Sequence, residues 1–274
     1  MRKLLAVLLA LVVPATVLPG RPAAAAPASV GQVAARASVW HVVAPGETMP
    51  SIARDSGLSA ADIGRWNQIV APYPVHVDET LRLTPPAVPL PAWRTRIEPV
   101  TPAMVNWNPA LHCPVPPAAL RRVWVSYIDL QGAYHDGSII VHRDVAVRVQ
   151  NIFLTLFRWR YRVMAMAPTS VNMPDAPNMA IVTAGYSCRP VGGTDVWSEH
   201  AFDTAIDINP LQNPMLRGGS VSPAGGSYYL DRSRYLIGMI HPEGAGRAFT
   251  ENGYFWGGQW RSVKDYMHFS LTNR

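Results

Sequence analysis

The chain has 274 residues, and its formal net charge of +6 comes from 24 lysines and arginines against 18 acidic residues. This length exceeds the roughly 100–200 residues of a usual single domain and leaves room for two folded units. The excess of cations is modest and contains no long run of like charge, which argues against a nucleic-acid-binding protein. Such a balance suits adhesion to an anionic cell envelope, or serves solubility alone.

The first 26 residues have the pattern of a secretory signal peptide. Arg2 and Lys3 form a basic start, residues 4–13 are an apolar run, and residues 24–26 are small, as at a cleavage site. The apolar run is shorter than the ~20 residues that cross a bilayer as a helix. We therefore expect a protein that is secreted or held in the cell envelope, without stable membrane insertion; a retained N-terminal anchor is the alternative. The signal holds three cations and no acid, so its removal leaves a net charge of 6 − 3 = +3.

Residues 27–39 are mostly small and are expected to form a short tether. The segment 40–84 then changes character and predicts the order strand, helix, helix, strand. These four elements are expected at residues 40–43, 48–55, 59–67 and 80–83.

The same segment resembles a LysM domain. The resemblance rests on Trp40-His-Val-Val-Ala-Pro-Gly-Glu-Thr-Met49, on Ser51-Ile-Ala53, on Asn67 and on Leu81-Arg-Leu83. It implies binding to N-acetylglucosamine chains of peptidoglycan or chitin. The glycan-binding residues that it implies are Gly46, Glu47, Thr48, Met49 and Asn67. A βααβ unit without sugar affinity is the alternative.

Residues 85–109 contain seven prolines, which predicts a semi-rigid extended linker. The remaining residues, 110–274, are expected to form the second domain. It should open with a hairpin over 123–142 and continue with an amphipathic helix over 145–157. His135 and His142 lie on this hairpin without carboxylate or cysteine partners at regular spacing, so we expect them to be structural.

The most informative residues for chemistry are His200, Asp207 and His268. A catalytic zinc usually takes three protein ligands from nitrogen and oxygen donors and keeps a fourth position for water. Because His200 and Asp207 are seven residues apart, they need a loop that folds back for both to reach one ion. Residues 266–271 alternate like a strand, which leaves His268 on the side opposite its apolar neighbours. Asp265 precedes this strand and is expected to act as a general base on water.

These residues carry a second resemblance, to the zinc D-alanyl-D-alanine carboxypeptidase family, which includes L-alanyl-D-glutamate endopeptidases and shares the hedgehog-type fold. The matching motifs are Cys188-Arg-Pro-Val-Gly-Gly193, Ser198-Glu-His-Ala-Phe202, Ala205-Ile-Asp-Ile-Asn-Pro210, Gln212-Asn-Pro214, Trp256-Gly-Gly-Gln-Trp260 and Asp265-Tyr-Met-His-Phe269.

This likeness covers roughly residues 110–272. It implies one Zn²⁺ on His200, Asp207 and His268, with Asp265 as the general base. It also implies that Arg189 neutralises the oxyanion or holds a substrate carboxylate. The fold that it implies is α+β, a small antiparallel sheet with helices packed on one side. The substrate contacts expected from the same motifs are Ser198, Trp256 and Trp260.

The chain departs from the family pattern at two positions. Asp203 stands where the family usually has glycine, and it can alter substrate choice or add a ligand if the loop backbone tolerates it. Ser270 stands where many relatives have glutamate, which removes one carboxylate from the surroundings of the metal. Glu199 is a rival candidate for the general base. Because it adjoins the ligand His200, we expect it instead to lie at the surface or to support a ligand without reaching the metal. Cys113 and Cys188 are the only cysteines and are expected to form a disulfide in an exported protein.

The sequence therefore predicts a secreted, zinc-dependent peptidoglycan peptidase that is monomeric and does not bind nucleic acid. LysM would target it to cell-wall glycan and so raise the local substrate concentration. The alternative is a non-catalytic peptidoglycan-binding protein with a relic zinc domain. Whether the enzyme acts as a carboxypeptidase or an endopeptidase depends on the closure of its cleft, which the sequence leaves open.

Overall fold

The computed structural model describes residues 39–274, with the exception of 68, 70, 87–90, 169–179 and 234. The expected signal peptide and nearly all of the expected tether therefore lie outside the described residues. Within the described ranges, no helix has the length and apolar character needed to cross a membrane.

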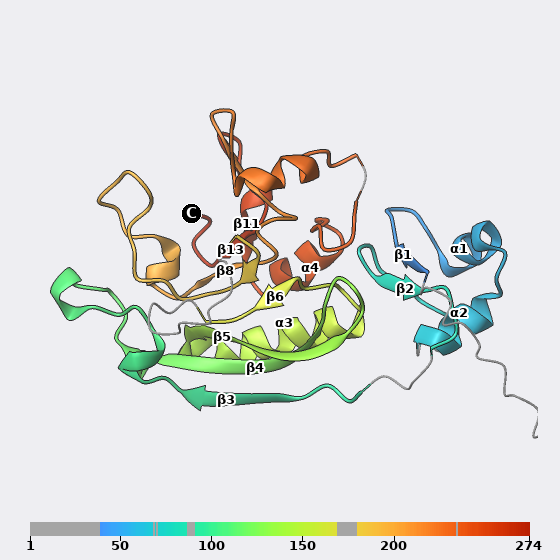
Figure 1. Cartoon of the computed structure of the whole chain (residues 1–274), viewed down its shortest axis with the longest axis horizontal. Coiled ribbons are helices and arrows are strands. Elements are labelled where there is room, and N and C mark those ends of the chain that lie inside the picture. The colour runs from blue at the N-terminus through green and yellow to red at the C-terminus, as the bar shows by residue number, and fades with distance from the viewer. Residues whose placement is uncertain (1–38, 68, 70, 87–90, 169–179, 234) are drawn as a thin grey trace, which may run out of the picture. The chain divides into compact units, whose positions relative to one another are not determined.

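The N-terminal module has the expected order strand, helix, helix, strand (Figure 1). Its elements are β1 (Trp40–Val42), α1 (Met49–Ser56), α2 (Ala60–Asn67) and β2 (Thr80–Arg82), and β1 pairs antiparallel with β2. The helices bury their apolar face on this ribbon, with Ile52, Ile63 and Leu81 among the residues of a small core. The spacing of the apolar residues in the sequence thus accounts for the order of the four elements and for the core between them.

The first sheet of the C-terminal domain has the order β3-β4-β5 and is covered by a helix (Figure 1). Its elements are β3 (Thr95–Pro99), β4 (Leu120–Ile128), β5 (Tyr134–His142) and α3 (Ala146–Arg158). All neighbouring strands of this sheet are antiparallel. The expected hairpin is present as β4 and β5, and the expected helix is present as α3. Residues 95–99, which fall inside the expected linker, instead form the edge strand β3; proline is tolerated at such an edge because no ladder bond is lost there.

Two further three-stranded antiparallel sheets carry the metal motifs, with the orders β11-β13-β8 and β10-β9-β12. Their strands are β8 (Ala205–Asp207), β9 (Met215–Arg217), β10 (Ser220–Ser222), β11 (Phe255–Trp256), β12 (Val263–Asp265) and β13 (His268–Ser270). The remaining elements are the parallel pair β6 (Ala165–Met166) and β7 (Val182–Thr183), and the helix α4 (Ala245–Thr250). The fold is therefore α+β with small antiparallel sheets, as expected.

Short 3-10 helices connect these elements. They are η1 (Pro102–Met104), η2 (Pro109–Leu111), η3 (Pro117–Ala119), η4 (Arg143–Val145), η5 (Glu199–Ala201), η6 (Ala224–Tyr229) and η7 (Gly257–Gln259). Among them, η5 carries the first expected metal ligand.

One apolar core joins the helix-covered sheet to the strands that carry the expected metal ligands. Phe269 of β13 is fully buried, and its ring stacks on Phe249 of α4 with centroids 4.0 Å apart. Both belong to the core cluster that also contains the apolar face of α3. Because β13 is anchored by its middle residue, its neighbour His268 has little freedom to move.

A second, smaller core lies beside the disulfide that joins Cys113 to Cys188. The side chain of Asn106 reinforces this link, because it accepts a hydrogen bond from Cys188 N at 3.0 Å and donates to Cys188 O at 3.2 Å. The expected disulfide therefore ties the start of the domain to the segment that leads into Arg189 and the metal motif.

Candidate metal centre

The pairing of β13 with β8 brings two of the expected ligands together. His268 lies opposite Asp207 in this antiparallel ladder. Residues that are opposite in such a pair present their side chains to the same face of the sheet. Since Phe269 points into the core, period-two alternation turns His268 to the other face. The register of two short strands therefore positions both ligands.

His200 reaches the same point because the chain reverses between η5 and β8. Ser198 caps η5, and its Oγ accepts a hydrogen bond from His200 N at 3.4 Å. Asp203 then adopts a left-handed backbone angle, with φ of 58°. Its amide donates to His200 O at 3.3 Å, and its carbonyl accepts from His142 N at 3.1 Å. This fold-back is the loop that the seven-residue spacing requires.

The three expected ligands bring nitrogen and oxygen atoms close enough together that they could hold one metal ion. His200 Nε2 lies 3.2 Å from Asp207 Oδ2, and His268 Nδ1 lies 3.1 Å from Asp207 Oδ1. All three side chains offer ligand atoms that lie within 4.8 Å of one another. Tetrahedral zinc with bonds of about 2.0–2.1 Å holds its ligands roughly 3.4 Å apart. Two imidazoles and a carboxylate at this spacing fit Zn²⁺.

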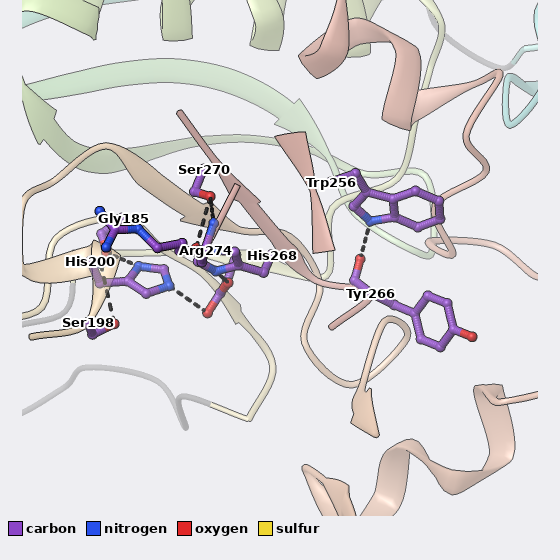
Figure 2. A network of polar contacts seen from close by, with 9 residues as sticks. Gly185, Ser198, His200, Trp256, Tyr266, His268, Ser270 and Arg274 are labelled. Atoms are coloured by element: carbon purple, nitrogen blue, oxygen red, sulfur yellow. Dashed lines mark hydrogen bonds and ion pairs between the residues drawn. The ribbon is translucent and has the colours of Figure 1, made fainter. Parts of the chain in front are cut away.

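Main-chain oxygens hold the outer nitrogen of each histidine (Figure 2). His200 Nδ1 lies 2.7 Å from Gly185 O, whereas His268 Nε2 lies 3.0 Å from Arg274 O. Main-chain oxygens accept hydrogen bonds and do not donate them, so in each ring the outer nitrogen carries the proton. His200 therefore offers Nε2 and His268 offers Nδ1 to a metal, and the outer bonds fix both ring orientations.

The electrostatics of the group favour an ionised ligand carboxylate. Burial by itself would raise the pKa of Asp207, but the charge of His200 and the hydrogen bonds from both histidines outweigh burial and lower it. Burial would lower the pKa of His268, yet its hydrogen bond to Asp207 raises it. Because ligands bind metal in their deprotonated form, an incoming ion would displace the protons in the hydrogen bonds between the two histidines and Asp207.

Asp265 has the features expected of a general base. Asp265 is the last residue of β12, and it lies close enough to the expected ligands for the charge of Asp207 to change its pKa. Its Oδ1 is buried without a hydrogen-bond partner among the described residues. Burial, and secondarily the negative charge of Asp207, raises the pKa of Asp265 to about 6. A carboxyl group with this pKa can both accept and return a proton near neutral pH.

Two cavities meet at the expected ligands His200 and Asp207. One of about 740 Å³ is lined by both histidines, Asp265 and several apolar side chains, and one of about 460 Å³ extends along β7 and its connection to the metal motif. Arg189, His200 and Asp207 line both cavities. Cavities therefore extend from these residues in two directions.

The expected substrate contacts occupy different positions. Arg189 is exposed and lines both cavities, and Trp260 lines the larger one. Ser198 also lines the larger cavity while it caps η5. Trp256, in contrast, lies in the core, and its Nε1 donates to Tyr266 O at 2.8 Å. This places Trp256 behind the metal strands instead of in a cavity wall.

Asp203 and Glu199 are clearly distinguished by their contacts. The carboxyl group of Asp203 is fully buried without a partner among the described residues, and burial raises its pKa well above the usual range. Glu199 accepts a hydrogen bond from Thr272 Oγ1 at 2.6 Å, and Arg274 Nε lies 3.7 Å from its other oxygen. Asp203 lies outside the group of ligand atoms, and Glu199 is engaged by the end of the described chain.

The five expected glycan-binding residues divide into interior and surface positions. Met49 is buried in the small core. The side chain of Asn67 donates to two carbonyls and accepts one amide hydrogen bond inside the module. Glu47 accepts from Ala44 N and contacts His41, both at 2.7 Å. Gly46 and Thr48 are exposed, and Thr48 caps α1.

Sequence reasoning missed residues that act through their main chain or through distant charges. Gly185 holds His200 through its carbonyl, and a side chain at Gly185 would collide with Ile140 O. Arg217 lines the larger cavity, and its charge offsets a part of the effect of burial, which raises the pKa of Asp265. The glycine was the only available signal, since close backbone approach demands it. Carbonyl contacts leave no trace in residue type.

Comparisons with known families agree with both resemblances. Residues 192–271 match the family model described as D-alanyl-D-alanine carboxypeptidase, and residues 41–84 match the model of the LysM domain. The first match contains the three ligand residues and Asp265, but Arg189 precedes it. Neither the curated proteins nor the solved structures yielded a match to this chain.

Proposed function

We propose that this protein is a zinc-dependent peptidoglycan peptidase that hydrolyses amide bonds of the stem peptide. The observation that carries the proposal is the convergence of three ligand atoms in the wall of one cavity, together with Asp265, whose buried Oδ1 has no hydrogen-bond partner among the described residues. The match of residues 192–271 to a peptidase family supports the reaction class, and the LysM match supports a cell-wall substrate.

The chemistry divides between the metal and the side chains around it. Zinc held by His200, Asp207 and His268 would supply Lewis acidity, which polarises a carbonyl and lowers the pKa of water to ~7. Asp265 would orient the attacking water, accept its proton as the oxygen bonds to the carbonyl carbon, and return that proton to the amine nitrogen as the C–N bond breaks. Arg189, exposed in the cavity, offers guanidinium donors to the developing oxyanion or to a carboxylate of the substrate.

The LysM module would hold the enzyme on glycan while the peptidase domain acts on neighbouring stem peptides. We assign the exposed turn at Gly46 and Thr48 to glycan contact, together with Glu47 beside it. The pattern of residues 1–26 and the disulfide between Cys113 and Cys188 support export to an oxidising compartment.

Digestion of defined muropeptides tests the proposal. The purified protein should cleave them when loaded with zinc, lose activity with a chelator and regain it when zinc is restored. Mass spectrometry of the products identifies the bond: release of a terminal D-alanine shows a carboxypeptidase, and a break after L-alanine shows an endopeptidase. Intact muropeptides after incubation with the zinc-loaded protein would reject the assignment.

A further inference from the structure

The segment after β13 turns back toward the metal group (Figure 2). Ser270 Oγ donates to Arg274 O at 3.0 Å and accepts from Arg274 N at 3.4 Å. Asn273 has a φ of 60°, a left-handed angle that asparagine tolerates better than most residues. Its Oδ1 also accepts from Trp260 Nε1 at 2.9 Å. Side-chain bonds therefore close residues 270–274 into a small loop.

This loop presents one oxygen to the third expected ligand. Arg274 O lies 3.0 Å from His268 Nε2, while Ser270 holds the same oxygen. Ser270 is fully buried and His268 is 6% exposed, so water has little access to replace the contact. The bond assigns the proton of His268 to Nε2 and leaves Nδ1 facing Asp207.

The same loop also contacts the segment of the first ligand. Thr272 Oγ1 donates to Glu199 Oε2 at 2.6 Å, and Arg274 Nε lies 3.7 Å from Glu199 Oε1. Glu199 immediately precedes His200 in η5. Two of the three ligand-bearing segments are thus tied to residues 270–274, which belong to no strand beyond Ser270.

We propose that residues 270–274 are a positioning segment for the metal centre, in which Ser270 holds Arg274 O against His268 and so fixes the ring for metal binding through Nδ1. The inference rests on the metal-binding role in the proposed function. Ser270 stands where the resemblance leads one to expect glutamate, and the hydroxyl recruits a main-chain oxygen to the outer nitrogen of the ligand. Outer contacts of this kind orient a ligand and increase its basicity.

Zinc affinity, measured by competition with a chromogenic chelator, tests the segment independently of hydrolysis. Ser270→Ala removes both bonds to Arg274 and should weaken zinc binding about 10-fold, at the lower end of the usual effect of such partners. Asn273→Val should have a similar effect, because a β-branched residue does not adopt the left-handed angle without strain. Asn273→Gly keeps that angle available, and Arg274→Ala keeps the main-chain oxygen, so both should stay within about threefold of the natural chain.

A second measurement separates positioning from general stability. In the zinc-loaded protein, the proton on His268 Nε2 should give a slowly exchanging resonance in proton NMR spectra, which Arg274→Ala retains and Ser270→Ala loses. Thermal unfolding of each variant identifies any that fails to fold. Zinc affinity equal to that of the natural chain in both Ser270→Ala and Asn273→Val would overturn the inference. A protein that shows these losses of affinity but never cleaves muropeptides would contradict the proposed function alone.

Discussion

Asn67 in the LysM module and Asp265 in the metal centre differ in how their buried polar atoms are hydrogen-bonded. Asn67 is buried in the module, and its amide makes three hydrogen bonds of 2.8–2.9 Å with the main chain of α2 and β2. Asp265 has a buried oxygen without any partner among the described residues, beside three converging ligand atoms. Because folded proteins pair nearly all their buried polar atoms, an unpaired one next to a cavity indicates a place for a ligand or for chemistry.

Replacing Asp265 should have the largest effect. Asp265→Asn keeps the shape of the side chain but cannot accept a proton, so kcat/KM on muropeptides should fall by about 10²–10⁴-fold. Zinc content, measured by metal analysis, should stay near one per chain because Asp265 is not among the ligands. Activity within a few-fold of the natural chain would show that another group acts as the base, and Glu199 would be the next residue to test.

Asn67→Ala should show that the buried amide of the module serves stability. The change removes the side-chain partner of Arg82 N and Arg82 O and one of the donors to Ile63 O, which should cost about 2–3 kcal/mol of unfolding free energy for the module. Chemical denaturation followed by tryptophan fluorescence measures it. At temperatures where the variant is folded, its affinity for chitin oligosaccharides should match that of the natural chain. A selective loss of affinity without loss of stability would assign Asn67 to the glycan site.

Asp203→Asn should stabilise the protein at neutral pH. Burial raises the pKa of Asp203 above its unfolded value, so the folded state favours the neutral acid. Asp203 therefore makes its full contribution to the free energy of unfolding at pH below the ordinary pKa of about 4. This contribution decreases as pH rises above about 4, because the unfolded chain ionises freely whereas the folded protein keeps the acid neutral. The gain in melting temperature of Asp203→Asn should therefore be larger at pH 7 than at pH 4. An equal difference at both values would contradict a neutral, buried Asp203.

The smallest effect is expected at the surface of the module. Glu47 contacts His41 at 2.7 Å, and both side chains are partly exposed, so Glu47→Gln should change the unfolding free energy by less than ~1 kcal/mol. If Glu47 contacts glycan as proposed, affinity for intact sacculi should fall while melting temperature stays nearly constant. Unchanged binding to sacculi would remove Glu47 from the glycan site.

Much of the architecture followed from local patterns. The βααβ order, the hairpin of β4 and β5, and the amphipathic α3 were predictable because apolar residues recur with the periods of strand and helix. The candidate ligands His200, Asp207 and His268 were recognisable from residue type and motif, since zinc chemistry accepts few side chains. The structure brings those three together as the motif predicted.

Contacts between distant segments could not be predicted in the same way. Trp256 and Trp260 belong to one motif, yet Trp256 packs in the core and Trp260 bonds to Asn273. The reason is that a two-residue strand and the turn after it point these rings in different directions, which composition does not encode.

The sequence by itself determined the chemistry that this protein can perform, because ligand identity and apolar period are properties of single residues and their neighbours. Only the tertiary structure decided which atoms are free to perform it. The register of β13 on β8 sets His268 opposite Asp207, and main-chain oxygens of Gly185 and Arg274 select the nitrogen that each histidine offers. These contacts depend on how the chain folds back on itself, and residues of every type carry a main-chain oxygen.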